Sequence, residues 1–377
     1  MNWWHHYNRF SGEQFDEFWR NHLSVERSVF FIVGVGFDPR VLGPLRTIVG
    51  HSRPGTTRCI AIDFQGSFSG DARAAALRDR NRAGLEQLFP GGTLEVRQLE
   101  PNDSDGIRSV SRNTAVMLGD LTDLNEFTDV VLDVSSLPRI IYLTIVNSML
   151  SQLVALDTPR PLASNVNLHV VYAESAGIDS RIAKKELELD LASIHGLSIR
   201  MDEEVAVTWP KIWFPILGEN NRESLERISQ LVNPDDVCPV LPMQARNARR
   251  ADNIVGEVGE LLFDGLRVDP RDLLYATEDN PFQLYRSLLG AMNRYTESLQ
   301  ELGGVRFILS PLSSKGLSIG ALLACFEKRN RSDVARDRIR TGFAYIETRR
   351  YEAAALSDGD EGVAVSLWLT GSCYANP

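Results

Sequence analysis

This sequence of 377 residues has few cysteines, no long apolar run and little that resembles a catalytic motif. Its four cysteines stand far apart with no Cys-x-x-Cys pair, so we expect buried thiols rather than disulfides or zinc ligands. No apolar stretch reaches the roughly 18 residues of a membrane-spanning helix, and no secretion leader is recognisable. A Walker phosphate loop and a His-x-x-x-His pair are also missing. These absences favour a cytoplasmic protein without a metalloprotease or P-loop site.

The composition is that of an ordinary globular chain with an excess of acidic residues. Hydrophobic residues make up 43% and charged residues 24%, and the formal net charge is −10. The length is sufficient for two domains with separate cores. An acidic balance disfavours an extended nucleic-acid surface, because such a surface must neutralise many phosphates. It is compatible with one small anionic ligand in a local basic pocket.

One stretch in the first half predicts a ligand-facing corner. Val130 to Val134 is rich in β-branched residues and apolar except for Asp133, as is typical of a parallel strand covered on both faces. It leads through Ser-Ser-Leu-Pro-Arg into a second apolar run, which we predict to be a buried helix with Pro138 in its first turn. Open parallel sheets bind ligands beyond the carboxyl ends of their strands, where helix N-termini attract anions. The pattern therefore predicts that Ser135, Ser136 and Arg139 hold a phosphate.

A similar pattern recurs in the second half of the chain. Residues 305–328 again read as strand, Ser-Ser, basic residue and apolar helix. Each copy is followed, at a similar offset, by a strand that ends in Tyr-x-Glu. We interpret the pair as an internal duplication, whose second corner consists of Ser313, Ser314, Lys315 and Gly316. The alternative is that two ordinary strand-turn-helix corners resemble each other by chance.

A glycine-containing loop follows the predicted strand Val29 to Val35. Glycine permits a sharp turn and a close approach of the backbone to a ligand. The loop from Gly34 to Arg40 is therefore expected to let a ligand come close to the backbone.

Two more candidate ligand residues also have ordinary structural interpretations. Asp63 ends the second predicted strand, where many Rossmann-like folds place an acid that binds a ribose hydroxyl, although a turn or capping role fits equally well. Arg246 belongs to an arginine-rich loop after the predicted strand Val237 to Leu241, and arginines at a strand end bind phosphate through two hydrogen bonds. The same loop also fits a solvated helix start.

The order of predicted elements indicates an α/β protein with two tandem Rossmann-like units of parallel sheet. We place an N-terminal helical segment at residues 1–28, the first unit at 29–209 and the second unit at 210–377. A charged helix is expected from Arg181 to Ala192. Residues 343–356 and 363–369 are expected to form a C-terminal antiparallel hairpin, because the segment between them is rich in turn residues.

Tandem Rossmann-like units with a Ser-rich corner and a following basic residue resemble the CARF and SAVED domains of prokaryotic antiviral systems. In those families, two such units face each other and bind a cyclic oligonucleotide between them. The resemblance implies that both Ser-Ser corners bind an anionic nucleotide. It implies the same role for the loop after the first strand, at Gly36, Phe37, Asp38 and Arg40. It also implies a non-catalytic sensor or assembly subunit with a protein partner. The first corner departs from the family pattern, since Leu-Pro replaces the usual glycines, and no nuclease or protease is attached.

The competing interpretation is an enzyme. The stretch from Gly34 to Arg40 resembles the Gly-x-Gly-Phe-Asp-x-Arg loop of carboxyl methyltransferases, which implies S-adenosylmethionine as cofactor and Asp63 as its ribose ligand. This alternative leaves the second half of the chain unexplained. A third interpretation is a scaffold subunit without any ligand. The corners contain no histidine or cysteine, and the adjacent His5 and His6 lack further ligands nearby, so we expect no catalytic residue and no metal site.

Overall fold

The computed structural model describes residues 2–53, 55–64, 71–119, 123–175, 183–192, 194–198, 208–243, 248–331, 338–352, 356 and 362–375. The chain divides into two compact units. The first unit contains His6–Glu186 and Thr348–Pro377, and the second unit contains Met1–His5 and Leu187–Glu347. These limits differ from the predicted ones at residues 28 and 209, because α1 belongs to the first unit and the second unit already begins at Leu187. In addition, Met1–His5 belong to the second unit and Thr348–Pro377 to the first.

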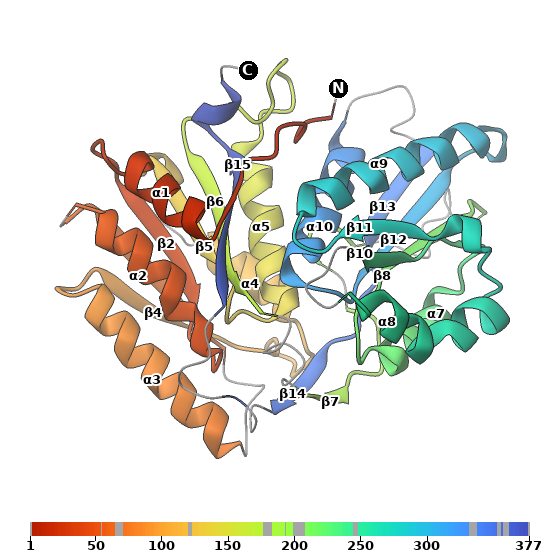
Figure 1. The fold of residues 1–377 in the computed structure, drawn as a ribbon, viewed down its shortest axis with the longest axis horizontal. Coiled ribbons are helices and arrows are strands. Elements are labelled where there is room, and N and C mark those ends of the chain that lie inside the picture. Colours follow the sequence, from red (N-terminus) through yellow and green to blue (C-terminus); the bar gives the residue numbers. More distant parts are fainter. Residues whose placement is uncertain are drawn as a thin grey trace. The chain divides into compact units, whose positions relative to one another are not determined.

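The first unit contains a sheet of five parallel strands, extended at one edge by two antiparallel strands (Figure 1). In chain order the strands are β1 (Arg9–Ser11), β2 (Val29–Gly34), β3 (Thr57–Phe64), β4 (Leu94–Leu99), β5 (Asp129–Asp133), β6 (Asn167–Glu174) and β15 (Val363–Thr370). Their spatial order is β1-β15-β6-β5-β2-β3-β4. Strands β2 and β5 are buried along their whole length, as expected for central parallel strands that helices cover on both faces.

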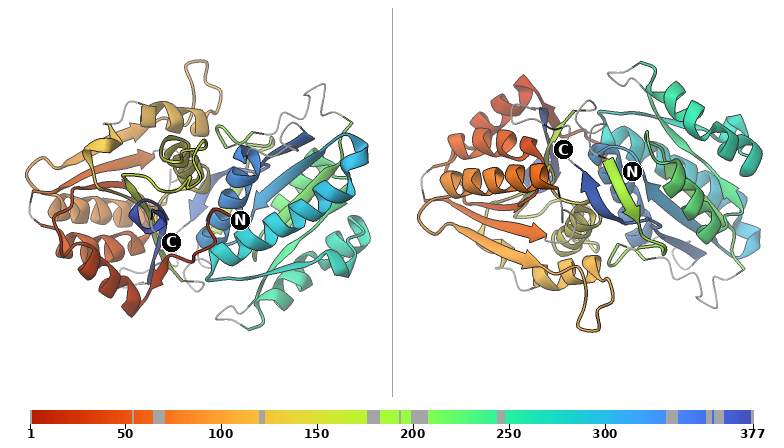
Figure 2. Two further views of the ribbon diagram at one scale, coloured as in Figure 1. Left: turned by 90° about the horizontal axis from the view of Figure 1, so that it is seen from above. Right: turned by 90° about the horizontal axis from the view of Figure 1, so that it is seen from below.

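Helices lie on both faces of this sheet (Figure 2). The helices are α1 (Glu13–His22), α2 (Leu42–His51) and α3 (Ala72–Leu88) on one face, and α4 (Val110–Gly119) and α5 (Arg139–Leu153) on the other. Short helical turns are η1 (Pro39–Val41), η2 (Leu124–Glu126) and η7 (Ser372–Tyr374). The predicted N-terminal helix is confirmed as α1, whose Phe15 and Trp19 are buried in one core with Phe31 of β2.

The second unit contains a fully parallel sheet. Its strands are β8 (Lys211–Ile216), β9 (Asp236–Val237), β10 (Val240–Met243), β11 (Leu274–Thr277), β12 (Val305–Pro311) and β13 (Ile339–Phe343). Their spatial order is β11-β10-β8-β12-β13, and β9 also pairs with β8. Pro239 separates β9 from β10, because proline has no N–H to donate to the ladder. The two segments therefore act as one interrupted strand beside β8.

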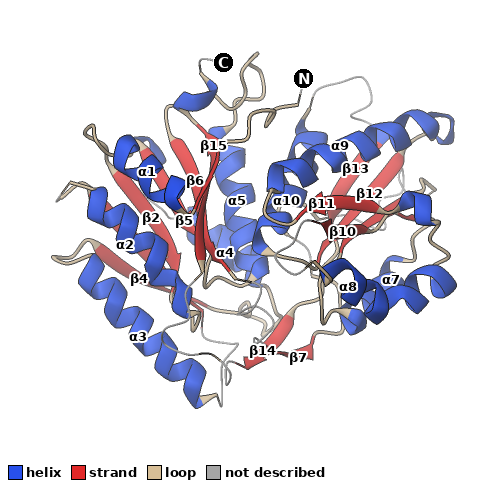
Figure 3. Ribbon diagram, viewed as in Figure 1, coloured by secondary structure: helices blue, strands red, loops and turns tan. Residues whose placement is uncertain are grey.

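Helices also cover the two faces of the second sheet (Figure 3). They are α7 (Arg222–Val232), α8 (Arg250–Gly259), α9 (Pro281–Ser298) and α10 (Lys315–Asn330), with short turns η3 (Glu260–Gly265), η4 (Pro270–Asp272) and η5 (Gln300–Leu302). Trp213 of β8 packs in a core with α7 and α8, whereas its neighbour Phe214 contacts Tyr295 of α9 on the other face. Among the described residues, no helix is long and apolar enough to cross a membrane.

The two parallel sheets share one topology. Leaving aside the edge strands β1 and β15, the first strand of each sheet in chain order, β2 or β8, lies at the centre. On one side of the central strand lie β3 and β4 in the first sheet, and β10 and β11 in the second, where β9 and β10 together count as one strand. On the other side lie β5 and β6 in the first sheet, and β12 and β13 in the second. The predicted α/β fold with two Rossmann-like units is therefore confirmed. In such folds, the crevice where the strand order reverses is the usual ligand site.

The predicted C-terminal hairpin is wrong. Strand β14 (Thr348–Glu352) pairs with β7 (Ala183–Leu187) in a separate two-stranded sheet, whereas β15 lies between β1 and β6 in the first sheet. The physical reason is that β6 would otherwise be an exposed apolar edge, which proteins cover or pair. The helix predicted from Arg181 to Ala192 is also wrong over Ala183–Leu187, which form β7.

Because β15 completes the first sheet, truncating its core side chain should loosen that sheet alone. Leu367 is fully buried and lies opposite Val170 of β6. We expect Leu367→Ala to cost about 2–5 kcal/mol in the first unit. Hydrogen exchange should therefore rise at β6 and stay unchanged at β12. Leu302→Ala, at a site that is 56% exposed, is the control. An equal rise of hydrogen exchange in β6 and β12 would contradict the conclusion that β15 stabilises only the first sheet.

Candidate functional site

The first Ser-Ser corner connects β5 to α5 and is held by hydrogen bonds on both sides. The Ser135 hydroxyl accepts a hydrogen bond from Ala173 N of β6 (3.1 Å), and the Ser136 hydroxyl donates to the Gly34 carbonyl of β2 (2.7 Å). Ser135 is buried, whereas Ser136 and Arg139 are partly exposed. Helix α5 begins at Arg139 without a side-chain cap. The corner therefore presents a basic residue beside helix N–H groups that have no intrahelical acceptor.

The loop after β2 packs directly on this corner. A Cβ atom on Gly36 would lie 2.7 Å from the Ser136 carbonyl oxygen, so only glycine fits. Asp38 caps the turn η1 and binds the Arg40 guanidinium through both carboxylate oxygens, at 2.8 and 2.6 Å. Phe37, Asp38 and Arg40 are all buried. These three predicted ligand residues therefore shape the loop, and their side chains are engaged inside the protein.

The second corner connects β12 to α10 and has a related construction. Ser313 is buried, and Ser314 caps α10 by accepting a hydrogen bond from Leu317 N (3.3 Å). Lys315 is the first residue of α10 and is partly exposed, whereas Gly316 is buried in the helix. The structure thus places the four predicted residues together at one helix N-terminus. Unlike α5, this helix has a side-chain cap at its start.

In both units, a glycine after the first strand presses against the corner after the fourth strand. In the second unit, a Cβ on Gly218 would lie 2.5 Å from the Leu312 carbonyl oxygen. That carbonyl accepts a hydrogen bond from the side chain of Asn221 (2.9 Å). In the first unit, Asn81 donates to the Gly36 carbonyl (2.8 Å). Each corner is therefore fixed at the strand-order reversal by a close backbone contact and an asparagine.

The last two predicted ligand residues, Asp63 and Arg246, belong to neither corner. Asp63 is fully buried at the end of β3 and accepts hydrogen bonds from Arg78 and from Gln98 (2.9 Å). Its carboxylate is thus engaged by protein donors. Arg246 lies outside the described residues.

Sequence reasoning overlooked one motif, since Gly316-Leu-Ser-Ile-Gly320 has the spacing of a Gly-x-Ser-x-Gly nucleophile elbow. Ser318 lies inside α10 rather than at a strand-to-helix turn, is fully buried, and donates to the Ser314 carbonyl (2.8 Å). It therefore lacks the exposed geometry of a nucleophile. The four cysteines are free, as predicted. Burial raises the pKa of the Cys325 thiol to about 11, which keeps it protonated and unreactive.

A buried acid lies in the second unit away from its corner. The Glu327 carboxylate, on α10, accepts hydrogen bonds from the Tyr285 hydroxyl and from Trp3 N (2.9 Å). Arg331 also reaches its other oxygen at 3.2 Å. Burial raises the pKa of Glu327 despite these donors. The contact fastens the first residues of the chain to the second unit.

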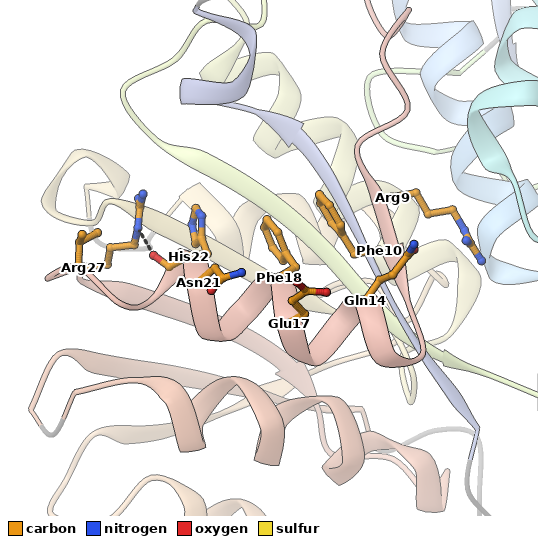
Figure 4. A pocket seen from close by; sticks show the side chains of 9 residues that line it. Arg9, Phe10, Gln14, Glu17, Phe18, Asn21, His22 and Arg27 are labelled. Carbon is orange, nitrogen blue, oxygen red and sulfur yellow. Dashed lines mark hydrogen bonds between the residues drawn. The ribbon is translucent and has the colours of Figure 1, made fainter.

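Sequence reasoning also missed a buried cluster in the first unit. Asp129 Oδ1 lies 2.7 Å from His22 Nε2 and 3.3 Å from His169 Nε2. These residues are separated by 107 and 40 positions, so no local motif marks them. A groove of about 730 Å³ runs along α1 beside the cluster. Figure 4 shows His22 and Arg27 at one end of this groove, and Phe18 and Phe10 further along it.

Comparisons with known proteins do not identify the chain. No protein-family model matches it, and no curated protein matches it. A solved structure assigned as a universal stress protein of Pseudomonas aeruginosa UCBPP-PA14 is similar over 87% of this chain and 96% of its own, with 11% sequence identity and a TM-score of 0.21. A similarity at this level carries no argument, so the fold rests on the strand order and the site on its geometry.

The close contacts at the corners predict a stability cost for any side chain there. We expect Gly36→Ala and Gly218→Ala each to lower stability by about 1–3 kcal/mol, because the new methyl group meets a backbone carbonyl that cannot move aside. Gly43→Ala in α2 is the matched control, since a Cβ there meets nothing within 4 Å. Chemical denaturation measures all three. Corner variants as stable as Gly43→Ala would contradict the packing described.

The buried acid predicts a pH dependence. Because the folded pKa of Glu327 is raised, its contribution to stability is complete below the ordinary value of 4.5 and declines as pH rises through the folded pKa. Glu327→Gln keeps an oxygen acceptor for Tyr285 and Trp3 and removes the charge. We expect its stability relative to the natural protein to increase from about pH 5 to pH 8.

Thermal unfolding across that range measures the effect. Glu297→Gln, at an exposed position of α9, should leave the pH profile unchanged. Parallel profiles for Glu327→Gln and the natural protein would show that the acid does not titrate as described.

Proposed function

We propose that this protein is a non-catalytic sensor or assembly subunit that binds an anionic nucleotide at its Ser-Ser corners. The observation that carries this proposal is that both units place the same type of corner at the same point of the same topology. Each corner stands beside the central strand of its sheet and begins a helix with a basic residue, Arg139 or Lys315. A helix start with a cation at this position favours phosphate.

The contacts of the corners suggest a division of roles. Ser135, Asp38 and Arg40 are buried and hydrogen-bonded within the protein, so they act as the frame. Ser136 and Arg139 are partly exposed and are the groups proposed to contact a phosphate. In the second unit, Ser314 and Lys315 have the corresponding positions. Because Ser314 already caps α10 while α5 has no side-chain cap, the first corner is proposed as the stronger phosphate site.

A nucleotide with several phosphates suits two such corners in one chain. A cyclic oligonucleotide is the ligand class implied by the resemblance to CARF and SAVED domains, and it is the ligand proposed here. Association with a protein partner in an antiviral system is part of the same proposal. The stoichiometry of binding distinguishes one ligand shared by both corners from separate ligands at each corner.

The methyltransferase alternative receives less support. In that alternative, Asp63 would bind the ribose of S-adenosylmethionine. Its carboxylate is fully buried and engaged by Arg78 and Gln98. The corners also contain no histidine or cysteine, and Ser318 is buried inside α10. These features favour binding without chemical turnover.

The proposal predicts that removing the basic residue of a corner weakens ligand binding. Arg139→Ala and Lys315→Ala should each cost about 1.5–3 kcal/mol, or roughly 10- to 150-fold in Kd, for a ligand found among cyclic di-, tri- and tetranucleotides. The loss should be larger for Arg139→Ala, because its helix has no side-chain cap. Isothermal calorimetry gives the Kd and the stoichiometry, and chromatography of the ligand after long incubation should show it intact.

The control variants are Arg46→Ala on the exposed side of α2 and Arg329→Ala at the far end of α10. Both should leave binding and thermal stability unchanged. Binding of S-adenosylmethionine but of no cyclic nucleotide would replace this proposal with the methyltransferase. Failure of every ligand to bind would favour the scaffold. A large loss of stability in Arg139→Ala would show a structural role for that arginine.

A further inference from the structure

The buried cluster of the first unit brings together three side chains that are common metal ligands. His22 is the last residue of α1, Asp129 is the first residue of β5, and His169 lies in β6. Their ligand atoms all lie within 4.8 Å of one another, and all three residues are buried. The cluster lies at the amino ends of the strands, about 20 Å along β5 from Ser135 at a rise of 3.3 Å per residue. It is therefore separate from the corners.

The distances fit a small divalent ion after a modest adjustment. Tetrahedral zinc with N and O ligands at about 2.0–2.2 Å separates neighbouring ligand atoms by roughly 3.3–3.5 Å. The 3.3 Å between His169 Nε2 and Asp129 Oδ1 already matches this separation. The 2.7 Å between His22 Nε2 and Oδ1 is a hydrogen-bond distance and must open by roughly 0.6 Å. His22 is the last residue of α1, so the adjustment falls at a helix end.

The surroundings orient the carboxylate for one metal bond. Thr128 Oγ1 and Arg27 Nη1 donate to Oδ2 of Asp129, at 2.7 and 3.3 Å. The other oxygen, Oδ1, is left to the two imidazoles. Outer donors of this kind hold the carboxylate ligands of metal sites in place. Arg27 also carries a positive charge, which limits the affinity for a cation without removing the ligand atom.

The two imidazoles are also held for ligation. Ring centroids of Trp368 lie 5.0 Å from His22 and 5.1 Å from His169, and Trp19 lies 4.7 Å from His169. Nδ1 of His169 has no hydrogen-bond partner among the described residues. Without a metal, Nε2 therefore carries the proton that it donates to Asp129, and metal binding must displace that proton. The groove along α1 reaches His22 and provides an entry path.

We propose that His22, Asp129 and His169 form a binding site for a zinc-class divalent ion in the first unit. Two imidazoles and one carboxylate are a ligand set that suits Zn²⁺ and Co²⁺. Three protein ligands leave a fourth position for water. The ion would join α1 to β5 and β6, so binding stabilises the first unit. The site is independent of the nucleotide proposed at the corners.

The experiment uses the full chain without a histidine tag, stripped with a chelator and titrated with Co²⁺ as a spectroscopic probe. We expect one Co²⁺ per chain with the visible absorption of tetrahedral coordination, displaced by Zn²⁺. X-ray absorption on the zinc-loaded natural protein should report two imidazole ligands, which needs no variant. Zn²⁺ should also raise the thermal midpoint, and the chelator should reverse this.

Variants assign the site. His22→Gln keeps an amide that can donate to Asp129 but offers no imidazole, and we expect it to weaken Co²⁺ binding more than about 100-fold. His169→Gln should do the same and provides a second test if either variant folds poorly by circular dichroism. His51→Gln, which changes a half-exposed histidine paired with Asp16, is the control and should bind normally. No Co²⁺ binding by the natural chain, or equal binding by His22→Gln, would overturn the proposal and make the cluster a hydrogen-bonded brace.

Discussion

In each unit, the loop after the central strand makes a close contact with the Ser-Ser corner after the neighbouring strand, and this contact sets the geometry of the corner. At Gly36 and Gly218 the backbone approaches a neighbouring carbonyl so closely that no side chain fits. This contact fixes where the fourth strand ends and where its helix begins, and an asparagine bonded to the same backbone reinforces it. A ligand site at this point is therefore framed by main-chain packing rather than by flexible side chains.

Features with a local cause were predictable from the sequence. The run before Ser135, rich in β-branched residues, predicted a strand covered on both faces, and the apolar run after Pro138 had helical length. The repeated pattern around Ser313 extended the argument to the second unit. The duplicated topology followed from those segments. Engagement of Asp63 by Arg78 was not predictable, because Asp63 lies in β3 and Arg78 lies 15 residues later in α3.

Features that depend on long-range pairing were missed. The polar segment before Val363 has the composition of a tight turn, which favoured a local hairpin. In the structure, β15 pairs instead with the apolar edge of β6, from Val363 to Thr370, although nearly 200 residues separate the two strands in sequence. In the same way, the His22 cluster assembles from three elements with no common motif. When a nearby strand and a distant strand would bury the same face of a third strand, the local composition does not show which of the two pairs with it.

The first unit therefore has two electrostatically different ends. At the carboxyl ends of its strands, α5 begins, and a helix start carries positive partial charge that favours an anion. At the amino ends, α1 finishes at His22, and a helix end carries negative partial charge that favours a cation. The polar residues follow this polarity, because serines and an arginine lie at the first end and two histidines around a carboxylate lie at the second. One parallel sheet with helices on both faces can thus supply two sites of opposite preference from the same backbone dipoles.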